Sequence, residues 1–531
     1  MKKAVKYLLS LLLVVLLFAN SASAIEDAQK PKRNFLKRVK IEEKSDKTSK
    51  DEIKLEAERV SHADVQTAKI SIQDGATLTL EECIDIALKN SPSVRKYENL
   101  VKTANAILGQ SKSNYFPSLN LGTGYTGYYQ HNKNYNSEFE NSYGLNASIS
   151  QLLFSFGKVG SLIKKARLNK IAADFDLNYE IIRTIFDVKT NYYAVLAANA
   201  NIKVQEANIL VNERQYHQTK AYFEEGLKSK IDLVNSEVNL SNARINYVSA
   251  QNTYDLAVVA LNNSMYIDGS PKYSIARLES FNFDNKYADV ALKHTNQEDV
   301  KKFEAPELAE GAVYQTSVQK NELINQSYNF TKFPYTLDES LVLAKNNRPD
   351  LKSYVAARDA LKRELTYQKI QYLPDLTATG AYGLNAARRD NLTNSFQIRG
   401  SLDFPMINAM NIKYKIDEAK ARLDIADAAV DKLEKDIHYS VQKAYVNMVQ
   451  YEQKLPLAEV AVKQTFENLE LAMGRYEVGL GNFLEVQDAI VNYNQAQQSY
   501  VKSIFDFNVS VAKLELEIAK IDKKEETTKD K

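Results

Sequence analysis

Four stretches of the chain alternate apolar and polar side chains with a period of two. This period is typical of β-strands with one apolar and one polar face. The polar segments 130–141 and 385–394 separate the members of each pair, so the pattern predicts two hairpins. The apolar positions of the four strands are Leu119, Leu121, Tyr125, Tyr143, Leu145, Ile149, Tyr382, Phe396, Ile398, Leu402 and Phe404.

Much longer stretches repeat their apolar residues at spacings of three, four and seven, which predicts α-helices. Residues 158–225 contain no proline, and an unbroken helix of that length would be roughly 100 Å long. Coiled-coil packing would bury its apolar stripe. The aligned helix of the second half contains Pro456, where we expect a kink or local break. Each long helix reaches a Gly-Leu pair, Gly226-Leu227 or Gly479-Leu480, which predicts a tight turn into a returning helix.

The chain is internally duplicated. Thr79 and Pro92 correspond to Thr336 and Pro349 at a shift of 257, and beyond a loop difference Gly226 corresponds to Gly479 at a shift of 253. The two predicted repeats span 78–263 and 334–520, and each contains a short helical stretch, a strand pair and a long helical hairpin. The remaining predicted parts are a signal peptide at 1–24, a charged and flexible extension at 25–77, an inter-repeat segment at 264–333 and a disordered tail at 521–531.

The first 24 residues have the features of a secretory signal peptide. Three lysines precede an apolar run at 7–19, and Ala22 and Ala24 form an A-x-A cleavage site. An uncleaved membrane anchor is the alternative, but the run is shorter than the roughly 17 to 25 residues that span a bilayer. Beyond it no apolar run is long enough for a membrane helix, so membrane insertion would require β-strands.

Composition argues against several classes of partner and chemistry. The formal net charge is +2, with 69 basic and 67 acidic residues, which gives no general argument for a nucleic acid partner. The 5 histidines are scattered and Cys83 is the 1 cysteine, so we expect no metal site, no cofactor and no enzymatic activity. Gly122, Gly124 and Gly127 match the dinucleotide fingerprint G-x-G-x-x-G, but no confident helix start follows them. A nucleotide enzyme is therefore a weak alternative.

Four strands are too few to close a barrel, and an exposed apolar sheet face would be a liability in a secreted chain. Apolar side chains toward lipid and polar ones toward a lumen are typical of a membrane β-barrel wall. The strands would then be completed by other subunits. A half-buried sheet packed on helices in a soluble protein remains the alternative.

The sequence resembles the TolC-like outer membrane efflux protein family over most of 78–520. The resemblance rests on "LTLEECIDIALKNSP", "SISQLLFSFGKVG", "RYEVGLGNFLEVQDA" and the duplication itself. It implies an α+β membrane protein in the bacterial outer membrane, a homotrimer whose four strands per chain form a 12-stranded transmembrane β-barrel. Long coiled-coil α-helices would form a trimeric α-barrel that extends into the periplasm. The family's members are exit ducts for drugs or proteins that work with a periplasmic adaptor and an inner-membrane transporter.

The resemblance also implies roles for residues at the helical tips. Tyr476 matches a tyrosine of the periplasmic gate, and Glu485 and Asp488 match an acidic ring at the entrance. A family arginine is replaced by Gly481, so the bonding of the closed state is expected to differ. The expected adaptor-docking residues are Gly226, Leu227, Gly479, Leu480 and Gly481. The acidic pair could instead be ordinary solvated charges, and the glycines could serve only as turn formers.

A periplasmic adaptor or coiled-coil structural protein is the alternative from a different class. It would share the signal peptide and the helical hairpins. It offers no reason for four amphipathic strands arranged as two repeated hairpins. The transported substrate is not indicated by the sequence.

Overall fold

The computed structural model describes residues 75–132, 135–269, 271–276, 333–386, 392–404 and 409–520. The chain divides into two compact units, Met1–Ala68 and Lys69–Lys531, and the described residues all belong to the second. The predicted signal peptide and tail, and most of the predicted extension and inter-repeat segment, lie outside the described residues. Among those described, no helix is both long and apolar enough to cross a membrane.

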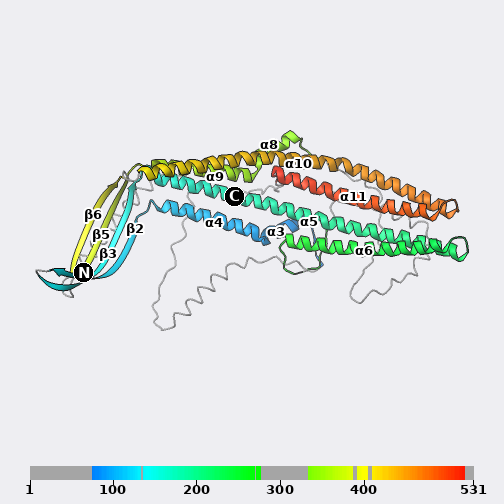
Figure 1. The fold of residues 1–531 in the computed structure, drawn as a ribbon, viewed down its shortest axis with the longest axis horizontal. Coiled ribbons are helices and arrows are strands. Elements are labelled where there is room, and N and C mark those ends of the chain that lie inside the picture. The colour runs from blue at the N-terminus through cyan, green and yellow to red at the C-terminus, as the bar shows by residue number, and fades with distance from the viewer. Residues whose placement is uncertain are drawn as a thin grey trace, which may run out of the picture. The chain divides into compact units, whose positions relative to one another are not determined.

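Two pairs of short helices precede the two strand pairs (Figure 1). The first pair is α3 (Leu80–Asn90) and α4 (Pro92–Ser113), and the second is α8 (Leu337–Asn347) and α9 (Pro349–Ile370). Thr79 and Glu82 form a capping box at the start of α3, and Thr336 and Glu339 form another at the start of α8. In each box the carboxylate accepts the threonine N–H at 2.8 Å, which satisfies a donor that the helix leaves free.

The four strands form one antiparallel sheet in the order β2-β3-β5-β6. The strands are β2 (Ser118–Asn132), β3 (Tyr135–Phe154), β5 (Asp375–Ala386) and β6 (Leu392–Asp403). The predicted polar turn at 130–141 is largely wrong, because Gln130 pairs with Glu138 and the ladder continues to Asn132 and Tyr135. Polar side chains do not prevent a ladder, since the backbone supplies its hydrogen bonds.

Two long helical hairpins follow the strands. The first consists of α5 (Lys158–Glu224) and α6 (Lys230–Ser264), and the second of α10 (Ala409–Glu477) and α11 (Phe483–Ile518). Figure 1 shows α6 beside the second half of α5 and α11 beside the second half of α10. The break expected at Pro456 does not occur, and α10 continues through it as one helix. Pro456 is exposed, so water can solvate the carbonyl group that loses its helical donor.

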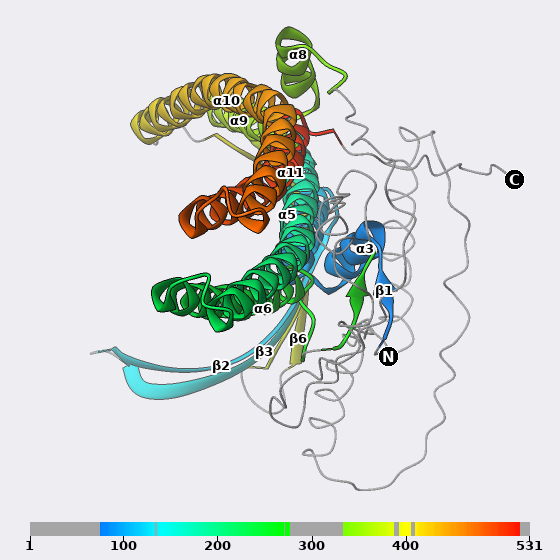
Figure 2. The same ribbon diagram turned by 90° about the vertical axis from the view of Figure 1, so that its right-hand side faces the viewer.

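The two repeats meet along α5. This helix packs on α4 and α6 of its own repeat and also on α9 and α11 of the second repeat. Figure 2, which looks along the helices, shows α10, α11, α5 and α6 following one another along a curved row. An apolar core joins α3 and α5 to α11 and the last turns of α10, and contains the fully buried Tyr192, Val188 and Ile504.

A small parallel pair ties the start of the first repeat to the segment after it. Strand β1 (Thr77–Leu78) pairs with β4 (Ser274–Ile275). Gly75 donates its N–H to the Lys272 carbonyl at 2.7 Å. The predicted flexible extension to residue 77 is therefore wrong for Gly75 to Thr77, because backbone hydrogen bonds fix these residues.

The glycines of the G-x-G-x-x-G match lie within β2. Gly122 pairs with Asn146, Gly124 with Gly144 and Gly127 with Asn141 in the antiparallel ladder. A dinucleotide site needs the third glycine to open a helix, and here the chain continues as strand. The nucleotide-binding hypothesis is therefore wrong at this position.

Candidate functional site: sheet faces and helical tips

Register places the apolar strand residues on one face of the sheet. Leu119 lies opposite Ile149, Ala147 opposite Tyr382, and Tyr382 opposite Phe396. Residues directly opposite one another share a face, so ten of the eleven predicted positions lie together, and Phe404 follows the end of β6. Side chains are exposed at Leu119, Leu121, Tyr125, Tyr143, Leu145, Phe396, Ile398, Leu402 and Phe404, and partly buried at Ile149 and Tyr382.

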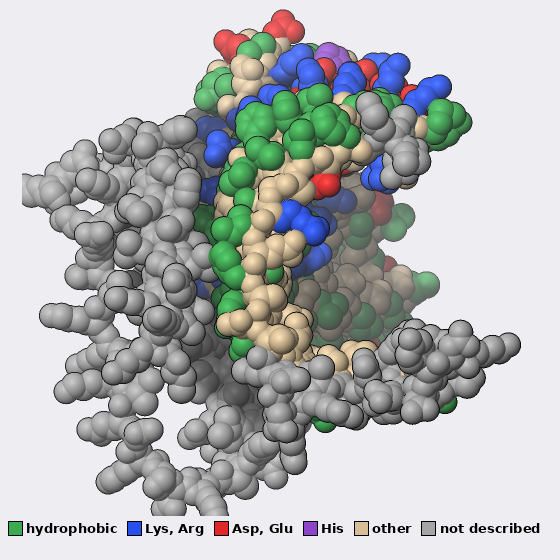
Figure 3. Space-filling model, turned by 90° about the vertical axis from the view of Figure 1, so that its left-hand side faces the viewer, with side chains coloured by type: hydrophobic (Ala, Val, Ile, Leu, Met, Phe, Trp, Pro, Cys, Tyr) green, Lys and Arg blue, Asp and Glu red, His purple; other side chains and the backbone are tan. Residues whose placement is uncertain are grey.

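The opposite face carries small and polar side chains. Asn120, Ser148, Ala381 and Gln397 lie on it in one row across the four strands. Figure 3 shows hydrophobic side chains in green along one side of the sheet, and backbone and other side chains in tan, with blue basic side chains, on the other. The sheet therefore separates an apolar surface from a polar one.

Aromatic side chains gather where the sheet joins the helices. Phe154 and Phe156 have ring centroids 4.7 Å apart, and Lys158 at the start of α5 forms a 2.9 Å ion pair with Asp375 at the start of β5. The exposed aromatic residues at this junction are Tyr115, Phe116, Phe154, Phe156, Tyr372 and Phe404. Such a belt is typical of the boundary between lipid and water in membrane barrels.

Both outer strands of the sheet have a free edge within the described residues. Strand β2 pairs only with β3, and β6 only with β5. Because consecutive neighbours are antiparallel, β2 and β6 run in opposite directions. A β6 edge could therefore pair antiparallel with the β2 edge of another copy.

The helical tips contain two turns of nearly the same shape. Gly226 has φ 76° and Gly479 has φ 77°, in the left-handed region that glycine occupies without strain. Leu227 and Leu480 follow them with 66% and 75% of their surface exposed. Two large apolar side chains thus project from the ends of the hairpins.

Gly481 packs closely against the last turn of α10. A Cβ atom there would lie 3.0 Å from the Tyr476 nitrogen and 3.1 Å from the Arg475 carbonyl carbon. The Gly481 N–H also donates to the Arg475 carbonyl at 2.8 Å. A side chain at this position would therefore require the backbone of Arg475 and Tyr476 to shift.

Tyr476 lies buried between the two hairpins of one chain. Its hydroxyl lies 3.5 Å from Thr219 Oγ1 on α5, and its ring lies 6.0 Å from that of Tyr222. Lys228 places its ammonium group 4.5 Å from the ring centroid. Burial raises the pKa of the Tyr476 phenol, and Asp232 and Tyr222 raise it further against the hydrogen bond with Thr219. The phenol is therefore neutral at physiological pH and can donate or accept a hydrogen bond.

A second link joins the hairpins beside Tyr476. Arg214 on α5 forms a 3.1 Å ion pair with Glu477, and the Tyr222 hydroxyl donates to the Glu477 carbonyl at 3.4 Å. Sequence reasoning missed Arg214, Thr219 and Lys228. For the gate, the resemblance pointed only to the second tip. The partners from the first hairpin become visible only once the two tips are placed together.

The two predicted acidic residues have different surroundings. Glu485 is the third residue of α11, where Asn482 caps the helix by accepting the Glu485 N–H at 2.8 Å. Its carboxylate lies 3.7 Å from Arg475 Nε. Asp488, one turn further on, is exposed. Part of the Glu485 charge is thus offset by Arg475 and by the positive end of the helix dipole, and the Asp488 charge faces solvent.

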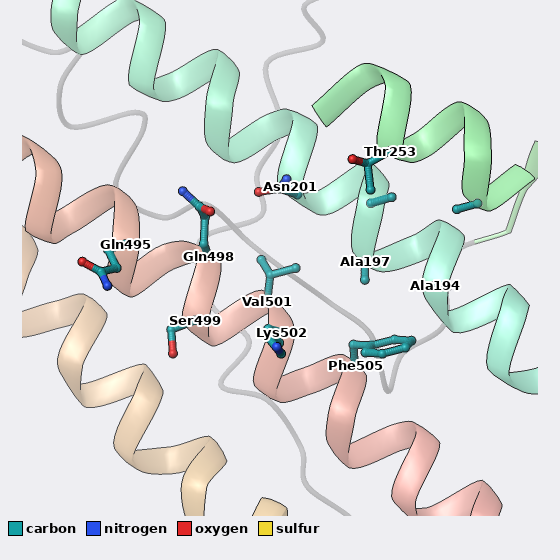
Figure 4. A pocket seen from close by; sticks show the side chains of 12 residues that line it. Ala194, Ala197, Asn201, Thr253, Gln495, Gln498, Ser499, Val501, Lys502 and Phe505 are labelled. Carbon is teal, nitrogen blue, oxygen red and sulfur yellow. The ribbon is translucent and has the colours of Figure 1, made fainter. Parts of the chain in front are cut away.

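A shallow groove of about 570 Å³ lies between α5, α6 and α11 (Figure 4). Ala194, Ala197 and Ala198 of α5 form one wall, and Val501 and Phe505 of α11 form part of another. In Figure 4 Asn201 and Gln498 approach each other from the two helices. Lys502 is the one ionisable side chain among the described residues that line the groove, which gives no arrangement of an acid with a base.

A four-stranded sheet joined to two long helical hairpins defines a class of fold seen in outer membrane channels. The Campylobacter jejuni CmeC outer membrane channel has a TM-score of 0.65 at 16% identity, over 83% of this chain and 85% of that one. The open state of the Neisseria gonorrhoeae MtrE outer membrane channel gives 0.63 at 16% identity, over 85% and 94%. These identities show likeness of fold.

Sequence comparison identifies the family. The model of the outer membrane efflux protein family matches residues 83–265 and 341–516, so the chain belongs to this family of outer membrane proteins. A Pseudomonas putida protein named solvent efflux pump outer membrane protein SrpC is 24% identical over 38% of this chain. Vibrio cholerae outer membrane protein TolC is 24% identical over 28%. The match spans 43% and 34% of the lengths of these two relatives.

Proposed function

We propose that the protein is the outer membrane exit duct of a tripartite efflux pump or type I secretion system. The observation that carries the proposal is the sheet, with one apolar face, one polar face and two free edges of opposite direction. Three copies joined β6 to β2 would give a closed 12-stranded barrel with no free edge. Strands of 12 residues or more exceed the roughly 9 to 11 that cross a bilayer.

The apolar face is the surface we assign to lipid. The row of Leu121, Ala147, Tyr382 and Phe396 would contact hydrocarbon, and the aromatic belt would lie at the boundary with water. The opposite face, with Asn120 and Gln397, would line the lumen. The long hairpins of three copies would then form the helical duct in the periplasm.

The helical tips would form the entrance. Tyr476, held by Thr219, Tyr222 and Lys228, would keep the two hairpins of one chain together in a closed state. Threefold symmetry would repeat Glu485 and Asp488 around a narrow aqueous path, which favours cations. Leu227 and Leu480 would be contacts for the periplasmic adaptor, with Gly226, Gly479 and Gly481 permitting close approach.

Planar bilayer recording on detergent-purified protein tests the function. We expect a heat-labile trimer that produces small, cation-selective conductance steps. A monomer recovered from the soluble periplasmic fraction would contradict the channel and favour the alternative, a periplasmic coiled-coil adaptor or structural protein. Turnover of a small molecule by this protein would contradict the expectation that it is not an enzyme.

The acidic ring has its own test in the same recording. Replacing both Glu485 and Asp488 by alanine should weaken block by multivalent cations, because six carboxylates would leave the trimeric entrance. Replacing Glu237, an exposed acid on α6, is the matched control. Unchanged block in the double variant would remove these residues from the entrance and leave the duct itself in place.

A further inference from the structure

The first repeat contains a polar pocket of about 350 Å³ between α4, α5 and α6. Its polar and charged lining includes Ser93 of α4, then Glu180, Arg183 and Asp187 of α5, and Asn263 and Ser264 of α6. No ion pair joins Asp187 to another side chain in the described part of the chain. Burial raises the pKa of its carboxyl against the charges of Arg183 and Lys513. Arg183 and Lys513 thus act on the Asp187 carboxylate from a distance, and no described side chain forms a salt bridge with it.

At the corresponding place in the second repeat, an arginine side chain fills the space between the helices. Arg348 donates to Glu517 Oε2 at 2.5 Å and to Asp350 Oδ2 at 2.6 Å. Ser440 of α10 donates to the same Glu517 oxygen at 2.7 Å. The Arg348 side chain is only 8% exposed. A guanidinium group therefore occupies the centre of the site and neutralises the acids around it.

The internal duplication shows that the two sites are equivalent. At the shifts of 257 and 253, Asp350 corresponds to Ser93, Ser440 to Asp187 and Glu517 to Ser264. Arg348 corresponds to Ser91, and both cap a helix with nearly equal backbone angles, φ −56° and −59°. In the first repeat the acid lies on α5 as Asp187, and Ser91 stands at the position of the second repeat's arginine.

The second-repeat site is also covered by a helix from the other repeat, α5. Lys352 of α9 lies 5.9 Å from the Phe175 ring, and Lys513 of α11 lies 5.3 Å from the Phe186 ring. Tyr179 lies on α5 between these two rings. The counterpart of α5 is α10, and the counterpart of Tyr179 is Lys432. Within the described residues α10 packs on α8, α9 and α11 of its own repeat, so the α10 that covers the first-repeat pocket must come from another copy.

Exposed apolar side chains support the same arrangement. Tyr439, Val446 and Leu457 of α10 are 67%, 56% and 69% exposed. Their counterparts on α5 are the partly buried Phe186, then Tyr193 at 9% and Val204 at 0%.

Helix α6 also exposes apolar residues whose counterparts in the second repeat are buried. Val248 and Val259 are 63% and 60% exposed, whereas their counterparts Val501 and Ala512 on α11 are 3% and 4% exposed. The faces of α10 and α6 that remain open in one chain are thus copies of the faces of α5 and α11 that are closed within it. A second copy of this chain is the occupant that matches both faces.

We propose that the first-repeat pocket is an intersubunit ionic site, completed by the Lys432 ammonium group of a neighbouring copy paired with Asp187. The proposal rests on the trimer of the proposed function and names a residue pair that holds it. Lys432 is 77% exposed and pairs with Asp436 one turn away. Exposed ion pairs of this kind contribute little to stability, so Lys432 can exchange Asp436 for another partner on assembly.

A charge exchange tests the pair in the full-length, detergent-purified protein. Asp187→Lys alone and Lys432→Asp alone should each raise the concentration at which half the trimer dissociates by about tenfold, because each places like charges at the site. The double variant should return to within about threefold of wild type. Light scattering coupled to size exclusion measures the trimer fraction, and circular dichroism checks that each chain remains helical.

The control is Lys420→Asp on the same helix, about three turns away. Combined with Asp187→Lys, it should give no rescue. Single variants that dissociate like wild type, or a double variant that is not rescued, would overturn the ionic site while the trimer stands. A wild-type protein that is monomeric at every concentration would overturn the proposed function as well.

Chemical cross-linking gives an independent measurement. A bismaleimide should join Asp187→Cys to Lys432→Cys between chains and produce dimers and trimers on a denaturing gel. Cys83 should not interfere, because it is fully buried and burial raises the pKa of its thiol to about 12. Cross-linking only within single chains would contradict the intersubunit site.

Discussion

Gly481 shows how one residue sets the shape of the turn at the second helical tip. A Cβ atom added at this position would lie only 3.0 to 3.2 Å from atoms of Arg475 and Tyr476, so the turn is tightest with glycine. The sequence indicated that an arginine of the family was missing here. It could not indicate that the turn has closed over the space, because that depends on atoms of the preceding helix.

Gly481→Ala should loosen this tip. The added methyl group must displace backbone atoms, which costs about 1 kcal/mol, so amide exchange at Leu480 should accelerate about fivefold. Gly474→Ala is the matched control, since a Cβ there meets nothing within 4 Å and alanine favours helix. Hydrogen exchange with mass spectrometry checks both, and equal rates in the two variants would contradict the close packing.

The buried Arg348 cluster predicts a pH dependence of stability. Burial pushes the Glu517 pKa up, but hydrogen bonds from Lys513 and Ser440 and the charges of Arg348 and Lys513 outweigh it, so the pKa is lowered. Because the folded pKa lies below the unfolded one, the stabilisation is fully present above the ordinary value of 4.5 and is lost as pH falls through the folded value.

Glu517→Gln should therefore lower the melting temperature at pH 7 and have a smaller effect near pH 3. Breaking a buried ion pair costs about 3 to 5 kcal/mol at neutral pH, and amide for carboxylate removes the charge and keeps the shape. Glu515→Gln, in a partly exposed pair with Lys189, is the control and should cost less. A difference between Glu517→Gln and wild type that is constant from pH 7 to pH 3 would argue against the pair.

The strands are the element that sequence reasoning located best. Alternation identified all four strands, because a period of two survives whenever one face is apolar. The length of the first hairpin was not foreseen, since only Tyr135 and Phe139 interrupt the polar run from Gln130 to Asn141. Backbone hydrogen bonds extend that ladder, and the alternation of apolar and polar side chains does not indicate them.

Phe396→Arg should impair insertion of the sheet into membranes. A charge on the lipid face of a barrel costs about 2 to 4 kcal/mol near the bilayer centre. Gln397→Arg, the next residue on the polar face, should insert like wild type. Heat-modifiable migration on cold denaturing gels after refolding into vesicles reports insertion. Equal loss in the two variants would mean that the apolar face does not meet lipid.

For the helices, the spacing of apolar residues predicts their extent but not their contacts with one another. Residues 158–225 were expected as one helix, and α5 ends at Glu224. The break at Pro456 was not observed, because a proline on an exposed face can be accommodated where water replaces the lost donor. The links from Arg214, Thr219 and Lys228 to the second tip depend on side-chain contacts between the ends of the two hairpins, which periodicity does not specify.

At the scale of the whole molecule, one chain leaves its apolar sheet face and its apolar α10 face open. If both are covered in the assembly, folding stability and association are linked, and the apparent melting temperature should rise with protein concentration. Differential scanning fluorimetry over a hundredfold concentration range in one detergent checks this. A melting temperature independent of concentration would indicate a chain that is stable alone.

The two unpaired edges also constrain the order of events during biogenesis. Contacts within the helical hairpins lie within one chain, whereas in the proposed trimer closure of the sheet would await other copies, so the helices should form first. Until then β2 and β6 each present a long row of free donors and acceptors that any extended chain could join. In the proposed assembly, a newly exported chain must therefore associate with other copies faster than it aggregates. A cell that overproduces the chain should need more of the chaperones that keep unfolded barrel strands soluble.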